Sequence, residues 1–151
     1  MKNLIWLGLI FLVFALSWIV GGALQQQGEH RYQLMTIPPC DPIVTSCTAS
    51  FADTSLNIKF TAPVIVMMPF KIGIEERAAL SNVYAVFRMK NMDMGSQRYR
   101  LEKNKEGLWQ SDVVLPVCSL GRSDWTLTLE AEYQHEVWRG DLDFTAASLS
   151  R

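Results

Sequence analysis

The residues best suited to binding a ligand are three sulfur-bearing side chains, Met92, Met94 and Cys118. Met92 and Met94 are two residues apart, so in an extended chain both thioethers point to the same face of a strand. Thioethers and thiolates are soft ligands, which suit Cu(I). We therefore treat these three residues as a candidate Cu(I) site. The alternative is that methionines simply fill gaps in a small core, and we assign Met67 and Met68 to the core in this way.

The number of cysteines decides whether Cys118 is free for such a site. There are three, so one has no intramolecular disulfide partner. Cys40 and Cys47 enclose a short loop in which Pro42 favours a turn, and we expect them to form a local disulfide. In the other pairing that the sequence leaves open, Cys47 bonds to Cys118 and removes its thiol from the site. Cys40 and Cys47 as metal ligands remain a further alternative, although their spacing matches no common zinc motif.

A predicted hairpin brings the thiol to the thioethers. The turn candidate 104–107 lies between Leu101 and Trp109. If those two side chains face each other across the strands, extending the same pairing outward places Met92 beside Cys118. A slip of one residue would reverse the faces.

Short strands are expected to support these residues. Between Pro38 and Ala147, apolar residues repeatedly alternate with polar ones, as in half-buried strands. The alternating apolar sets are Leu56, Ile58 and Phe60; Phe70, Ile72 and Ile74; Val83, Ala85, Phe87 and Met89; Trp125, Leu127, Leu129, Ala131 and Tyr133; and Trp138, Leu142 and Phe144. This pattern predicts an all-β fold, specifically an immunoglobulin-like β-sandwich. We expect Trp109 and Trp125 to be buried in its core.

The segment Leu4–Leu24 carries no charge over 21 residues. At a rise of about 1.5 Å per residue it spans roughly 30 Å, the thickness of a bilayer core, which predicts one transmembrane helix. Trp18 suits the aromatic belt at a membrane interface. The alternative is a signal peptide cleaved near the small residues 21–23. Lys2 precedes the segment and places the N-terminus in the cytoplasm by the positive-inside rule.

These observations divide the chain into four parts. Residues 1–24 form the cytoplasmic N-terminus and anchor, residues 25–37 a tether, residues 38–147 an extracytoplasmic domain and residues 148–151 a tail. The predicted location is a bacterial inner membrane, crossed once, with the C-terminal domain in the periplasm. Disulfides persist in such an oxidising compartment.

Charge and motifs exclude several functions. The net charge of −1, without a basic stripe, gives no reason to expect a nucleic-acid partner. The two histidines, His30 and His135, match no zinc-protease, deaminase or triad spacing, and there is no glycine-rich phosphate loop. We therefore do not expect the protein to be an enzyme, and the sequence identifies no small-molecule substrate. We also expect the acidic side chains to lie on solvent-exposed faces.

Several of these motifs together resemble a known family. They are Phe87-x-Met89-x-x-Met92-x-Met94-Gly95, Gly107-x-Trp109, Leu115-Pro116-x-Cys118 and Trp125, behind an N-terminal anchor. This arrangement is similar to the FixH-like and YtkA-like domains, over roughly residues 55 to 146. The resemblance implies an immunoglobulin-like fold and a role in copper handling or in haem–copper oxidase assembly. Met92, Met94 and Gly95 match the pattern, whereas the segment 40–47 lies outside it.

The sequence thus leads to two functional hypotheses. In the first, the chain is a membrane-anchored periplasmic binding protein that handles Cu(I) beside an inner-membrane protein partner. In the second, it is a non-metal structural or interaction subunit of an inner-membrane complex. A thiol oxidoreductase ranks third, because the sequence lacks the Cys-x-x-Cys motif and the βαβ pattern of that class.

Overall fold

A computed structural model describes residues 17–18, 32–92 and 95–148 of the chain. The chain separates into two compact units, Met1–Arg31 and Tyr32–Arg151. Of the predicted anchor, only Ser17 and Trp18 are described, and both are helical. Among the described residues, none belongs to a helix with the length and apolar character needed to cross a membrane. The predicted transmembrane helix thus lies almost wholly outside the described residues.

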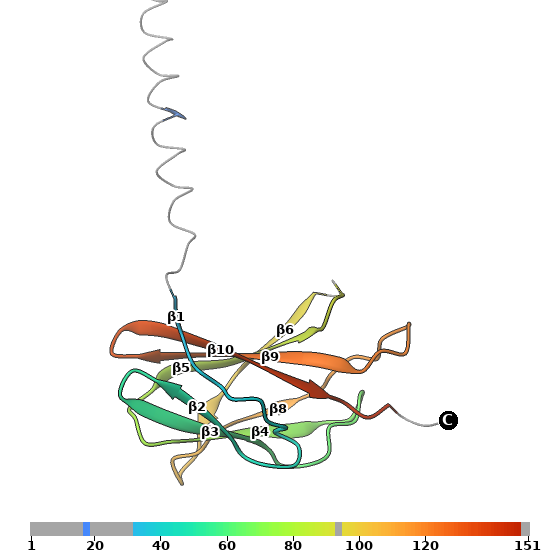
Figure 1. The fold of residues 1–151 in the computed structure, drawn as a ribbon, viewed down its shortest axis with the longest axis horizontal. Helices are drawn as coiled ribbons and strands as arrows, with labels where there is room; N and C mark the ends of the chain where they lie inside the picture. Colours follow the sequence, from blue (N-terminus) through green and yellow to red (C-terminus); the bar gives the residue numbers. More distant parts are fainter. Residues whose placement is uncertain (1–16, 19–31, 93–94, 149–151) are drawn as a thin grey trace, which may run out of the picture. The chain divides into compact units, whose positions relative to one another are not determined.

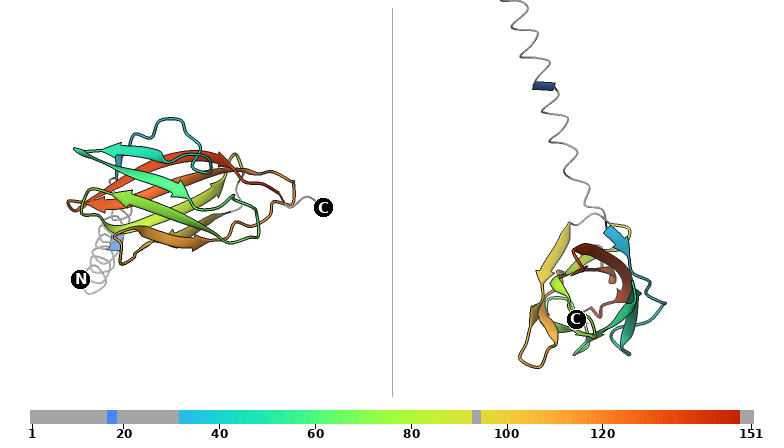
Figure 2. Two further views of the ribbon diagram at one scale, coloured as in Figure 1. Left: turned by 90° about the horizontal axis from the view of Figure 1, so that it is seen from below. Right: turned by 90° about the vertical axis from the view of Figure 1, so that its left-hand side faces the viewer.

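The second unit is all-β and consists of two five-stranded sheets, as the alternating pattern predicted (Figure 1). Sheet A has the order β1 (Tyr32–Leu34), β10 (Glu136–Thr145), β9 (Asp124–Tyr133), β5 (Ser81–Met89) and β6 (Ser96–Arg100). Sheet B has the order β2 (Cys47–Phe51), β3 (Thr54–Phe60), β4 (Phe70–Glu76), β8 (Trp109–Val113) and β7 (Glu102–Lys103). The views in Figure 2 show the strands of the two layers enclosing a common interior.

The core lies between the sheets because each strand turns its apolar positions inward. Leu56, Ile58 and Phe60 of β3 are all buried, and the residues between them are exposed. Phe87 of β5 is fully buried at the centre of an aromatic cluster. Its ring lies 5.9–6.5 Å, centroid to centroid, from four others, those of Phe60, Phe70, Tyr99 and Phe144. Most of the predicted inward-facing residues therefore belong to the observed core, whereas Tyr133 and Trp138 are half-buried and pack against it.

The predicted hairpin around residues 104–107 has a different register. Lys103 pairs with Trp109 and Glu102 with Gln110, so the expected pairing of Leu101 with Trp109 is wrong by two positions. The side chain of Asn104 sets this register, because its Oδ1 accepts hydrogen bonds from the backbone N–H groups of Glu106 and Leu108, both at 2.9 Å.

The chain also changes sheets within this segment. β6 pairs with β5 in sheet A, whereas β7 pairs with β8 in sheet B. Leu101, between β6 and β7, is buried and donates its N–H to Val83 O at 2.9 Å. Trp109 is only half-buried, contrary to expectation, whereas Trp125 is buried as expected.

The tether predicted for residues 25–37 overlaps the folded domain. Tyr32–Leu34 forms β1, which pairs in parallel with β10, and Thr36 exchanges two backbone hydrogen bonds with Ser50 of β2. The segment thereby contacts both sheets along one side of the sandwich. Gly140 permits this approach, since a Cβ there would lie 2.9 Å from Met35 Cβ. Within the described residues, the strand pairing thus already includes Tyr32–Leu34 and Thr36, which the sequence analysis assigned to the tether.

The sequence analysis expected the acidic side chains to lie on solvent-exposed faces, but two of them are buried. Glu130 of β9 is buried on the outer side of sheet A, where it forms ion pairs with Arg98 and Arg139. The side chain of Glu76 is 3% exposed and pairs with Lys103 at 2.6 Å. Each buried carboxylate thus has a cationic partner, as burial of a charge requires.

Candidate metal site at one end of the sandwich

Two of the three candidate residues, Met92 and Cys118, lie in two connections at the same end of the domain, on the right in Figure 1. Met92 belongs to the turn that follows β5, and Cys118 to the connection 114–123 between β8 and β9. The turn is tied to β9 by the hydrogen bond from Lys90 N to Asp124 O, at 3.0 Å. Around Cys118 the chain forms its own turn, with Gly121 N donating to Cys118 O at 3.0 Å and Gly121 at φ +70°.

The two sulfurs are in contact. Cys118 Sγ lies 3.7 Å from Met92 Sδ, within hydrogen-bonding distance for sulfur. Cys118 is 3% exposed and Met92 is half-buried. The sequence predicted this proximity, but by a route that the structure does not follow, because β6 pairs with β5 and not with β8. The two residues meet because the connections that follow β5 and β8 lie at one end of the sandwich.

Two further observations delimit the site. Met94, the third candidate ligand, lies outside the described residues. Among the residues that the structure describes, no group of three or more His, Cys, Asp or Glu side chains is arranged to hold a metal ion. The described part of the candidate site is therefore a thiol and a thioether.

Charged groups hold the turn that carries Met92. Lys90 forms an ion pair with Asp143 of β10, and Thr126 Oγ1 donates to Asp143 Oδ1 at 2.6 Å. These hydrogen bonds from Lys90 and Thr126 hold the pKa of Asp143 below its ordinary value of 3.8. Lys90 and Asp143 also line an open polar hollow of about 410 Å³ beside the turn. The ion pair is thus a positioning contact for the start of the turn.

This arrangement predicts a pH dependence. Because the folded-state pKa of Asp143 is lowered, its stabilisation is present above the unfolded-state pKa and is lost as the pH falls through the folded-state value. Asp143→Asn should therefore reduce the stability at pH 7 by less than about 1 kcal/mol, since the pair is half-exposed and screened. The difference from the wild type should begin to shrink near the ordinary aspartate pKa of about 3.9 and vanish only below the lowered folded-state pKa of Asp143. Urea unfolding at several pH values measures it; a constant difference down to pH 2 would contradict the assignment.

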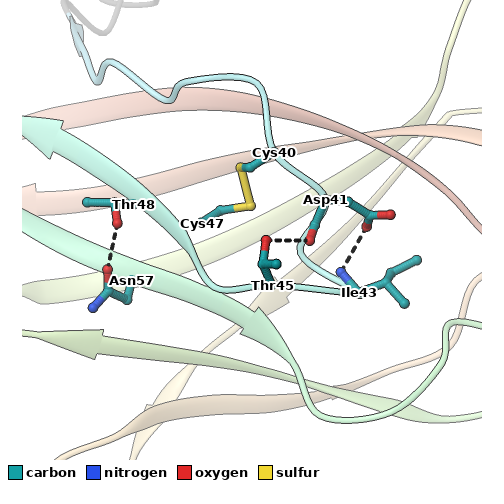
Figure 3. The surroundings of a disulfide bond; sticks show 7 residues. All are labelled: Cys40, Asp41, Ile43, Thr45, Cys47, Thr48 and Asn57. Carbon is teal, nitrogen blue, oxygen red and sulfur yellow. Dashed lines mark hydrogen bonds between the residues drawn. A yellow bond between two sulfur atoms is a disulfide. The ribbon is translucent and has the colours of Figure 1, made fainter.

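The predicted local disulfide is present. Cys40 and Cys47 are bonded, with their Cα atoms 5.8 Å apart (Figure 3). Asp41 shapes the loop between them, because its Oδ1 accepts from Ile43 N and its carbonyl from Thr45 N, both at 2.9 Å. Cys118 is a free, buried thiol. The alternative pairing of Cys47 with Cys118 does not occur.

The assignment of Met67 and Met68 to the core is wrong. Met67 is 57% exposed and Met68 47% exposed, in the connection between β3 and β4. Other exposed apolar side chains lie in the β8–β9 connection, at the same end of the sandwich: Val114, Val117 and Leu120. The sequence did not predict these exposed side chains, because a short apolar run such as 64–68 is also what a buried strand would show.

The described residues thus define a two-sheet β-domain with a thiol–thioether contact at one end. No protein-family model matches the chain, and searches of curated proteins and of solved structures also find no match.

Proposed function

We propose that this chain is a membrane-anchored periplasmic binding protein that holds Cu(I) through Met92, Met94 and Cys118. The observation that carries the proposal is the 3.7 Å separation between Met92 Sδ and Cys118 Sγ. Two bonds of roughly 2.3 Å to a common ion at this separation enclose an angle of about 107°, close to tetrahedral. The pair can therefore bind one ion without a change in the sulfur–sulfur distance. Thiolate and thioether ligands favour Cu(I) over harder cations.

The wider context supports the same proposal. The two-sheet fold is compatible with the immunoglobulin-like sandwich of the FixH-like and YtkA-like domains, and the uncharged segment Leu4–Leu24 with a single anchor. The Cys40–Cys47 disulfide suits an oxidising compartment such as the periplasm. In this setting the domain assists copper handling or haem–copper oxidase assembly, beside an inner-membrane protein.

The test is a Cu(I) titration of the full chain in detergent, against a competing chelator and with a mild reductant that keeps copper monovalent. Met92→Leu, Met94→Leu and Cys118→Ala should each lower the affinity by at least about tenfold, since even second-shell changes have effects of that size. The leucine variants should change stability by less than about 1.5 kcal/mol, because volume and hydrophobicity are kept.

Met89→Leu is the matched control, because Met89 is a buried core methionine on β5, three residues before Met92. It should leave the affinity unchanged. The proposal fails if the wild type binds no Cu(I), or if Met89→Leu weakens binding as much as Met92→Leu does.

The second candidate function is that of a structural or interaction subunit. It is favoured by the exposed apolar residues of the β8–β9 connection, where Val117 is 58% and Leu120 74% exposed. Apolar side chains gathered at one end of a domain are typical of a protein contact. This function needs no metal, so Met92→Leu would leave complex assembly intact, whereas Val117→Ser with Leu120→Ser would impair it.

A further inference from the structure

The turn Ile65–Met68 presents two thioethers to solvent. Met68 N donates to Ile65 O at 3.1 Å, which closes a four-residue turn. Its third residue, Met67, has φ +65°, a left-handed conformation in which glycine is ordinarily preferred. A methionine at such a position costs stability, and a strained residue that persists points to a functional role.

Three backbone contacts hold this turn in place. Val66 N donates to Ala147 O at 3.1 Å, and Met67 N donates to Leu115 O at 2.8 Å. Ala147 N in turn donates to Val64 O at 2.7 Å, and the side chain of Val66 is buried. The turn is thus fixed between the C-terminal segment and the β8–β9 connection. Met67 and Met68 are therefore exposed on a turn whose backbone is held by hydrogen bonds on both sides.

The same connection leads to the candidate metal site. Leu115, which accepts the hydrogen bond from Met67, precedes Cys118 by three residues, a stretch of at most about 11 Å. Cys118 itself is 3% exposed, so a metal donor has little direct access to its thiol. Met67 and Met68 place two soft thioether ligands at the surface of this end of the domain.

We propose that Met67 and Met68 form an entry site that receives a soft monovalent cation and passes it to Met92 and Cys118. This inference rests on the proposed Cu(I)-binding function. The transfer is a ligand exchange: the bond from Cu(I) to a methionine thioether breaks as the bond to Cys118 Sγ forms. Copper stays monovalent throughout, and the Cys118 thiol releases its proton to solvent. The entry ligands therefore govern the rate of loading, and the inner ligands govern the affinity.

The experiment measures both quantities on the full chain in detergent. Cu(I) is supplied as its complex with a chromophoric chelator, and loading is followed by stopped-flow absorbance. The double variant Met67→Gly with Met68→Leu should load several-fold more slowly than the wild type, with an unchanged equilibrium affinity. Met92→Leu should lower the affinity instead. Met89→Leu, the buried control, should change neither.

A second measurement separates entry from folding. Met67→Gly relieves the left-handed strain, so its melting temperature should equal or exceed that of the wild type while its loading slows. Equal loading rates for the wild type and the double variant would overturn the entry site and leave the proposed function intact. A fall in equilibrium affinity at unchanged rate would also overturn it, by making these methionines ligands of the final site. Absence of Cu(I) binding by the wild type would overturn both proposals.

Discussion

Phe87→Ala is expected to reduce the free energy of unfolding by about 3–5 kcal/mol, the range for truncating a fully buried aromatic residue. Phe87 is 0% exposed, and its ring contacts aromatic residues from both sheets, Phe60 and Phe70 of sheet B and Phe144 of sheet A. Removing it leaves a cavity that these rings can fill only in part. Domains have roughly 5–15 kcal/mol of stability in total, so the loss should be visible as a lower urea midpoint.

Tyr84 provides the control on the same strand. It is half-buried on the outer side of sheet A, where the Arg98 guanidinium lies 4.1 Å from its ring centroid. Tyr84→Ala removes a comparable ring that the core does not need, so its effect on the urea midpoint should be much smaller. Equal decreases in the urea midpoint for the two variants would mean that β5 does not have one face in the core and the other face outside it.

The sequence predicted the layers of this fold well, because alternation along a strand reports directly on burial. Phe87 and Leu127 pair across β5 and β9, and both are buried, as their phases indicated. The weaker predictions concern segments with little alternation. The three-residue β1 is exposed throughout and depends on pairing with β10, a contact that no local pattern reveals. The change of sheet near Leu101 is likewise a tertiary feature.

The contact between Met92 and Cys118 was predicted by the wrong route, and the place of Met94 in the site stays a prediction. Residue chemistry singled out soft sulfur ligands, and the predicted hairpin register then placed Cys118 beside Met92. Their contact, however, arises from two connections that meet at one end of the sandwich, not from a shared hairpin. The exposed turn at Met67 was missed because a positive φ at a non-glycine residue has no signature in the sequence.

Removing the Cys40–Cys47 disulfide is the second large expected effect. The bond closes a loop of eight residues, for which the loss of chain entropy in the unfolded state corresponds to about 2.5 kcal/mol. The double variant Cys40→Ala with Cys47→Ala should therefore unfold at clearly lower urea concentration than the wild type. Cys47 begins β2 and is buried, so part of the loss will come from packing in the core. The wild type with its disulfide reduced separates the two contributions, because it keeps both sulfur atoms.

Binding and stability should respond differently to this change. The disulfide joins the Cys40 segment to β2, and Pro42 O in the same loop accepts a hydrogen bond from Phe60 N at 3.0 Å, which keeps the loop on sheet B. The contact between Met92 and Cys118 belongs to the connections after β5 and β8 and does not include this loop. The double alanine variant should thus lose stability but, while folded, bind Cu(I) with the wild-type affinity.

Single replacement of Cys40 frees the Cys47 thiol, and mass spectrometry then shows whether the Cys47 thiol forms a disulfide with Cys118. Formation of a Cys47–Cys118 bond in that variant, with loss of Cu(I) binding, would show that the native disulfide is what keeps the thiol of the site free.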